Sequence, residues 1–161
     1  MTDLPNECNA YTLTYRDILP ACRCLYIQIK TPKNIEVRIL NRLVIAQGEQ
    51  LGIRFLKEPQ FQPGNRRIIP VCLDDRSDAQ AATCFFSDPT DVNGGTLIEE
   101  SMVPKFAYHL GGTPVEAPIY ARTLQENSNY MLVVRNEGFA PTDVLVCLLF
   151  TETPAGNRQV T

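Results

Sequence analysis

Histidine and tryptophan are nearly absent from this chain. Of its 161 residues, one is histidine and none is tryptophan. His109 would have to serve any Ser-His-Asp or Cys-His mechanism, and no Gly-x-Ser-x-Gly elbow surrounds a serine. The adjacent carboxylates of Asp74–Asp75 and of Glu99–Glu100 point to opposite faces of an extended chain, so neither pair forms an acid–base dyad. We therefore predict no enzyme and no catalytic residue.

The chain also lacks an excess of basic charge and a long apolar run. Lys and Arg total 15 against 18 Asp and Glu, a formal net charge of −3, which does not fit a nucleic-acid partner. The longest apolar run, Val144–Phe150, is far shorter than the roughly 20 residues that cross a bilayer, so no membrane partner is expected. The glycine pairs Gly94–Gly95 and Gly111–Gly112 lack the lysine and helix of a phosphate-binding loop. No cofactor is predicted.

Cysteine is present in quantity: the six are Cys8, Cys22, Cys24, Cys72, Cys84 and Cys147. The N-terminus has no cationic stretch leading into an apolar core, so no secretory signal is expected, and free thiols are favoured over a disulfide framework. Cys72, Cys84 and Cys147 lie in apolar stretches and are predicted to pack in the core. Cys22 and Cys24 have no second pair at zinc-binding spacing, so no metal site is predicted.

Hydrophobic residues recur mostly with period two. Apolar and polar residues alternate over 25–29, 35–39 and 51–55, as in half-buried strands. Later apolar stretches raise the expected number of strands to about nine, separated by turns rich in Gly and Pro. No window of helical length carries an apolar stripe. We predict an all-β fold, an antiparallel β-sandwich of jelly-roll kind in a single domain.

Three parts are expected along the chain. Residues 1–20 form an N-terminal arm or a first strand, in which Tyr11, Leu13 and Tyr15 alternate with polar residues. Residues 21–153 form the β-sandwich domain. Residues 154–161 form a polar C-terminal tail.

Two segments echo each other. Phe55–Pro59 matches Phe85–Pro89, and each is followed at the same distances by a glycine and an isoleucine, at positions 64 and 68 and at 94 and 98. Each copy has the pattern of a strand, a break at an acidic residue before proline, a glycine turn and a further strand. We interpret the echo as a duplicated structural unit, with a paired ligand site as the alternative.

The last strands are apolar on both faces. Within Val144–Phe150, the even-numbered side chains and the odd-numbered Leu145, Cys147 and Leu149 are all apolar, and Met131 and Val133 form a similar second face earlier in the chain. Because an antiparallel sandwich buries only one face of each strand, the second face needs another cover. A loop, the N-terminal arm or a subunit interface would supply it, and a closed cyclic oligomer is a natural candidate.

The order of these signals resembles a class of viral proteins. The acidic-Pro-to-Gly turns, the segment Gly94-Gly95-Thr96-Leu97, and the ending Leu124-x-x-Asn127-x-x-Tyr130-x-Leu132-x-Val134-x-Asn136 leading to Phe150-x-Glu152 resemble tailed-bacteriophage capsid decoration, or cement, proteins. The resemblance covers Ile35 to Glu152.

The resemblance implies a β-rich homotrimer that binds the major capsid protein on the outside of the shell. Such a protein would be located in the virion, after assembly in the host cytoplasm. For the capsid or subunit interface, the sequence offers the apolar residues of its first segment: Leu4, Tyr11, Leu13, Tyr15 and Ile18. A tail fibre, spike or adaptor component and a carbohydrate-binding or hydrolytic β-sandwich are the alternative functions.

Overall fold

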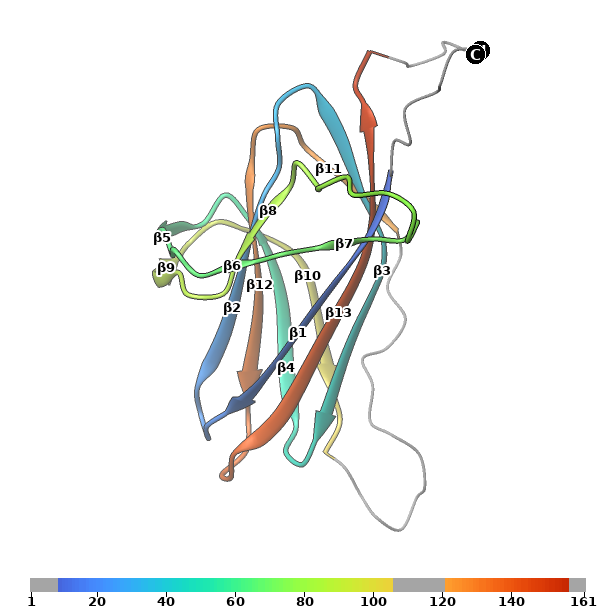
Figure 1. Ribbon diagram of the computed structural model, residues 1–161. Helices are drawn as coiled ribbons and strands as arrows, with labels where there is room; N and C mark the ends of the chain where they lie inside the picture. The colour runs from blue at the N-terminus through green and yellow to red at the C-terminus, as the bar shows by residue number, and fades with distance from the viewer. Residues whose placement is uncertain (1–8, 106–120, 157–161) are drawn as a thin grey trace, which may run out of the picture.

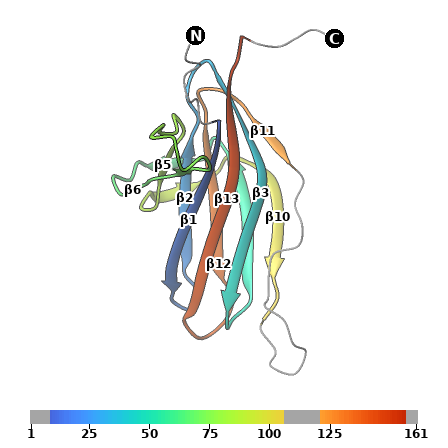
Figure 2. The same cartoon turned by 45° about the vertical axis from the view of Figure 1, so that its right-hand side comes forward.

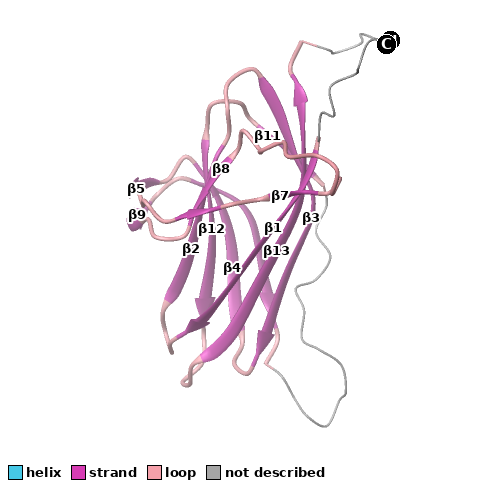
Figure 3. Ribbon diagram, viewed as in Figure 1, coloured by secondary structure: helices cyan, strands magenta, loops and turns pink. Residues whose placement is uncertain are grey.

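The chain folds entirely into strands and loops where it is described. The structure is a computed structural model that describes residues 9–105 and 121–156. Its paired strands are all antiparallel, and Figure 3 shows strands joined by loops with no helix among the described residues. These residues therefore include no helix long and apolar enough to cross a membrane. The all-β prediction is confirmed.

The strands are short at the middle of the chain and long toward both ends. They are β1 (Ala10–Leu19), β2 (Cys24–Lys30), β3 (Ile35–Gln47), β4 (Leu51–Lys57), β5 (Gln60–Gln62), β6 (Arg67–Ile68), β7 (Val71–Cys72), β8 (Cys84–Phe86), β9 (Thr90–Asn93), β10 (Thr96–Val103), β11 (Arg122–Leu124), β12 (Asn129–Asn136) and β13 (Thr142–Pro154).

Two large sheets lie face to face (Figure 1). The five-stranded sheet has the order β11-β3-β13-β1-β7, and the six-stranded sheet has the order β10-β4-β12-β2-β8-β6. A separate two-stranded sheet pairs β5 with β9. The chain crosses between the large sheets from β1 to β2, from β3 to β4 and from β12 to β13, so strands that follow one another lie in opposite layers.

The core fills the space between the two large sheets. Alternate residues of β13, from Val144 to Phe150, are at most 2% exposed, because they face the six-stranded sheet. The ring of Phe150 contacts both Tyr11 on β1 and Phe85 on β8, with ring centroids 5.5 and 5.3 Å apart. These contacts join the two layers through large apolar side chains.

The sequence predicted either an extended arm or a first strand for residues 1–20. In the structure, residues 10–19 form the strand β1. The strand pairs with β13 along its whole length, from Ala10 opposite Thr151 to Leu19 opposite Thr142. Since β13 is the central strand of its sheet, this pairing makes β1 part of the domain rather than an appendage.

A bulge in β3 decides which residues of that strand face the core. The register against β13 shifts between Phe150, opposite Ile39, and Leu149, opposite Asn41. The extra residue reverses the alternation, so Arg42 is buried while Leu43 is half-exposed on the outer face. Without the shift, the period-two pattern that begins at Ile39 would have placed Leu43 in the core.

The two echoed segments meet in space. Each contributes one strand of the small sheet, with Gln60 on β5 opposite Asn93 on β9. We call this pair of strands and its turns, residues 58–63 and 89–95, the flap. Gly94 has a φ of +65°, as a glycine turn requires, whereas Gly64 is needed for close approach, because a Cβ there would lie 2.1 Å from an Asp88 carboxylate oxygen.

The prediction of free thiols is wrong for Cys72, which is disulfide-bonded. Cys22, Cys24, Cys84 and Cys147 are free. Cys72 is 8% exposed, and burial of that kind suits a reduced thiol and a disulfide equally. Of the three cysteines predicted to pack in the core, only Cys72 is buried. Cys84 and Cys147 are half-exposed, because each lies at a position of its strand that faces away from the core.

Candidate functional site

The structure separates the residues predicted to form the capsid or subunit interface. Tyr11 and Leu13 are at most 2% exposed and belong to the core, and Tyr15 packs against that core. Ile18 is 67% exposed. Leu4 lies outside the described residues. Ile18 is therefore the described member of this set whose side chain is available to a partner.

The outer face of the five-stranded sheet is apolar along its two central strands. We call Leu43, Ile45, Leu145, Cys147 and Leu149 the outer apolar face. Ile45 lies opposite Leu145 and Leu43 opposite Cys147, so their side chains form adjacent cross-strand pairs. All five are half-exposed. In Figure 2, no described segment lies in front of β3 and β13.

This face continues toward the edge of the sheet. Thr12 on β1 lies opposite both Leu149 on β13 and Val71 on β7, which places Val71 on the same side. Val71 is 63% exposed, and its neighbours Ile69 and Leu73 are 61% and 54% exposed. Large apolar side chains are thus available to a partner from β3 to the edge strand.

An ion pair between Arg16 and Asp143 lies at one end of the outer apolar face. Arg16 donates hydrogen bonds to both carboxylate oxygens of Asp143, with Nε 3.0 Å from Oδ1. The hydrogen bond and charge of Arg16 hold the pKa of Asp143 below its ordinary value. Both groups are at the surface, so the pair defines a polar rim rather than a source of large stability.

The outer face of the six-stranded sheet is also apolar, but the chain covers part of it. Leu56, Met131 and Val133 form a second cluster of buried residues on this side of the sheet. Phe61 of β5 and Val92 of β9 pack against them. The flap is therefore the cover for the second apolar face of β12.

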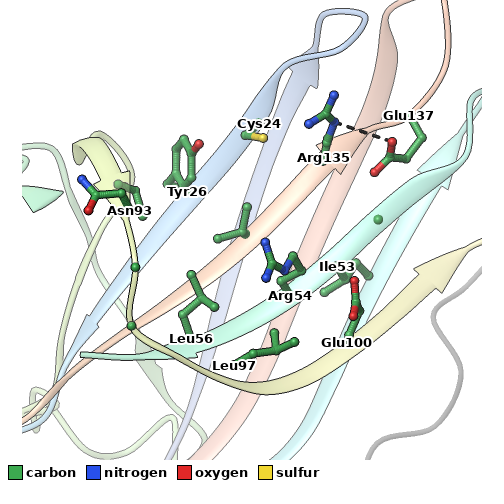
Figure 4. Close-up of a pocket in the computed structure, with 15 residues that line it drawn as sticks. Cys24, Tyr26, Ile53, Arg54, Leu56, Asn93, Leu97, Glu100, Arg135 and Glu137 are labelled. Atoms are coloured by element: carbon green, nitrogen blue, oxygen red, sulfur yellow. Dashed lines mark ion pairs between the residues drawn. The ribbon is translucent and has the colours of Figure 1, made fainter. Parts of the chain in front are cut away.

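Beside the flap the same face is hollowed into a groove of about 420 Å³ (Figure 4). The groove lies within the size range of small-ligand sites. Its lining comes from four strands of the six-stranded sheet and from the flap: Cys24, Tyr26, Gly52, Ile53, Arg54, Leu56, Val92, Asn93, Gly94, Gly95, Leu97, Glu100, Val133, Arg135 and Glu137.

The strand register places four of these side chains in one row across the sheet. Val133 lies opposite Tyr26 on one side and Arg54 on the other, and Arg54 lies opposite Glu100. Neighbouring strands are about 4.8 Å apart, so the row is about 14 Å long. In order it presents an aromatic ring, an aliphatic side chain, a cation and an anion.

The charges of the groove are balanced and partly unpaired. Arg135 lies 3.6 Å from Glu137 at one end (Figure 4). Within the described part of the chain, Arg54 and Glu100 have no ion pair, although they are neighbours in the row. Burial and a hydrogen bond with Cys24 raise the pKa of Tyr26, so this phenol is neutral at physiological pH.

Two glycines shape the walls of the groove. A Cβ on Gly52 would lie 2.6 Å from Oε1 of Glu137, so the missing side chain leaves room for that carboxylate above the strand. Gly95 has a φ of +83°, and a Cβ there would lie 2.9 Å from backbone atoms of Lys57 and Pro59. Gly95 excludes larger residues because backbone atoms block the space, whereas a side chain at position 52 would displace the exposed Glu137.

Glu99 and Glu100 point to opposite faces, as predicted for adjacent residues of a strand. Glu100 lines the groove, whereas Glu99 turns between the sheets. There it lies 3.2 Å from Arg122 and 3.9 Å from the buried Arg42, whose guanidinium is 6.0 Å from the ring centre of Phe55. The ion cluster of Arg42, Glu99 and Arg122 joins β3, β10 and β11 on the inner side of the sheet. Glu100 takes no part in this cluster and lies on the outer face.

The described residues hold no group of three or more His, Cys, Asp or Glu side chains that could bind a metal ion. His109 lies outside the described residues.

The resemblance to decoration proteins rests on residues with structural roles. Asn136 is fully buried and donates hydrogen bonds to the carbonyls of Leu19 and Ala140, which fixes the turn between β12 and β13. Glu152 accepts hydrogen bonds from the backbone amides of Ala82 and Thr83, and so anchors the loop before β8.

Sequence reasoning missed the groove. Its residues come from four separate segments of the chain, and no local motif joins them. The one feature of the sequence that pointed to this region was the pair Gly94–Gly95, which predicts a turn. In the structure this turn forms the lip of the groove.

No family model, no curated protein and no solved structure matches the chain. The resemblance to capsid decoration proteins stays a prediction.

Proposed function

We propose that this chain is a structural virion protein of the decoration class, which binds the outside of a bacteriophage capsid as a homotrimer and stabilises it. The outer apolar face is the observation that carries the proposal. Apolar patches of this kind on a soluble domain mark sites of protein contact. We assign this face to the contact between copies in the trimer, since a cyclic assembly buries the same patch on every subunit.

The strand order supports the prediction that this all-β fold is an antiparallel β-sandwich of jelly-roll kind. Four strands of the five-stranded sheet follow the order β11-β3-β13-β1, and four of the six-stranded sheet follow β10-β4-β12-β2. This is the order that results when paired strands wrap around two sheets, as in a jelly roll. Viral capsid domains and lectin domains both use that architecture, so the fold permits the proposal without deciding it.

The proposed mechanism is linkage. A protein that binds only the assembled shell stabilises that shell by RT ln(1 + [L]/Kd), about 2.7 kcal/mol at a hundredfold excess over Kd. A trimer that touches several capsid subunits at once gains further from its high effective concentration. Loss of the trimer contact would therefore weaken capsid binding even with the capsid-binding surface intact.

The test is co-sedimentation of the purified protein with shells of the source phage's major capsid protein, together with native mass spectrometry. Leu145→Arg places a charge in the outer apolar face, and Phe139→Ser alters a side chain that is 95% exposed outside it. We expect trimers and saturable binding for the wild type and for Phe139→Ser, and monomers with weakened binding for Leu145→Arg. A monomeric wild type that stays in the supernatant would refute the proposal. Gold labelling of the protein on whole particles tests the alternative: label over the head is expected, and label at one pole would favour a tail component.

A further inference from the structure

We propose that the groove on the six-stranded sheet binds a neutral oligosaccharide. The groove lies on the opposite layer from the outer apolar face, so this inference does not depend on the capsid proposal. Four observations carry it: the balanced charge of the lining, the unpaired polar side chains of the central row, the position of the groove on a sheet face, and the apolar surface beside those polar groups.

The balance of charge favours a neutral ligand. Two arginines, Arg54 and Arg135, and two glutamates, Glu100 and Glu137, line the groove. An anionic ligand placed among them would meet the glutamates, and a cationic ligand would meet the arginines. A ligand with many hydroxyl groups satisfies both, because each hydroxyl donates one hydrogen bond and accepts others.

The central row has unused hydrogen-bonding capacity. The side chains of Arg54 and Glu100 are exposed and, among the described residues, make neither an ion pair nor a hydrogen bond. Adjacent hydroxyls of a sugar ring match an arginine beside a carboxylate, since the guanidinium donates and the carboxylate accepts. Asn93, at the flap end of the groove, adds its amide oxygen, while its amide nitrogen donates to the carbonyl of Asp91.

The position on a sheet face argues against an extended peptide. Peptides that add to a sheet pair with the free backbone groups of an edge strand. Here the floor is formed by β4 and β12, whose backbone groups pair with strands on both sides. On this floor only side chains are left to recognise a ligand, and backbone groups are offered at the walls alone, by the glycine turn and the edge strand β10.

Apolar surface lies next to these polar groups. The ring of Tyr26 and Leu97, which is 43% exposed at the other wall, supply this surface, whereas Val133 beside Tyr26 is 9% exposed and is covered by the flap. Sugar rings have faces made of C–H groups, which pack against aromatic and aliphatic surfaces while their hydroxyls stay at the edge. Tyr26 suits this role because its partly buried ring lines the groove and offers an apolar face.

The groove is formed before any ligand binds. Gly95 holds the lip of the groove in a conformation that a larger residue would disturb, and the flap is fixed by apolar contacts with the sheet. A site of this kind loses little conformational entropy on binding.

The experiment measures binding of the full chain to an array of neutral and acidic oligosaccharides, followed by calorimetric titration with the neutral hexasaccharide that gives the strongest signal. The variants are Arg54→Met and Glu100→Gln, which change exposed side chains and leave the core intact. The matched control is Arg38→Met, which removes an exposed arginine from β3 in the other sheet.

We expect saturable binding to a neutral oligosaccharide, weakened about tenfold by each groove variant, as for loss of a hydrogen bond to a charged group, and unchanged by Arg38→Met. Binding to acidic glycans only, or to none, would overturn the proposal. Equal binding by the wild type, Arg54→Met and Glu100→Gln would overturn it as well. None of these results bears on trimer formation through the other sheet.

Discussion

The outer faces of the two sheets differ in how their apolar residues are covered. On the six-stranded sheet, Met131 and Val133 lie under Phe61 and Val92 of the flap, and Met131 is fully buried. On the five-stranded sheet, the outer apolar face stays half-exposed. An apolar second face therefore indicates that a cover is needed but does not tell whether the chain itself supplies it.

The difference comes from the route of the chain between β4 and β10. This segment forms the flap on the outer side of the six-stranded sheet, adds β6 and β8 to one edge of that sheet, and reaches the edge of the other sheet as β7 (Figure 1). It covers one outer face and only extends the other at its edge. The surface left for the proposed trimer contact is therefore the outer face of the five-stranded sheet.

The largest expected effect is a difference in unfolding free energy between a substitution on the covered face and one on the open face. Met131→Ala removes a fully buried side chain and should lower the free energy of unfolding by about 3 kcal/mol. Leu145→Ala removes a half-exposed side chain from the outer apolar face and should lower the free energy of unfolding by about 1 kcal/mol or less in the monomer. Chemical denaturation of both variants at low protein concentration measures the difference. Equal losses would mean that the two faces are covered alike.

A smaller effect is expected from the flap itself. Gly95→Ala introduces a Cβ 2.9 Å from backbone atoms at a φ of +83°, which should cost about 2 kcal/mol. Gly94→Ala has the same kind of backbone conformation in open space, so it should cost about 1 kcal/mol. Hydrogen exchange at residues 60–62 should rise more in the first variant. A larger effect of Gly94→Ala would show that the flap does not close on the sheet at Gly95.

The smallest effect concerns the rim of the open face. Because Arg16 lowers the pKa of Asp143 in the folded state, the carboxylate contributes stability above its ordinary value of 3.8 and loses it as the pH falls through the lowered value. Melting temperatures between pH 5 and pH 2 should therefore fall slightly less for Asp143→Asn than for the wild type. Identical pH profiles would show that the surface pair contributes nothing measurable.

The strand pattern could be predicted from the sequence because alternation is a local property. The stretches 25–29, 35–39 and 51–55 all lie within strands of the structure. The bulge in β3 could not be predicted, since it depends on the register against β13, more than a hundred residues away along the chain. That register decides that Arg42 turns inward and Leu43 outward.

The candidate sites were predictable only in part. The second apolar face of β13 is visible in the alternation of Leu145, Cys147 and Leu149, and the structure leaves it open. The interface predicted for the first segment placed Tyr11 and Leu13 outside, whereas pairing of β1 with β13 turns both into the core. The groove could not be foreseen, because its central row exists only after β2, β12, β4 and β10 are aligned.

Differential alkylation of two cysteines tests the central claim most directly. Cys147 lies in the outer apolar face and Cys24 in the groove, and both are free and half-exposed, while the exposed Cys22 serves as an internal standard. Labelling with iodoacetamide at low and high protein concentration, read by peptide mass spectrometry, compares the two sheets in one sample. The account predicts that Cys147 becomes protected as the protein assembles while Cys24 stays reactive. Cys147 labelled equally at both concentrations, or Cys24 protected in its place, would contradict it.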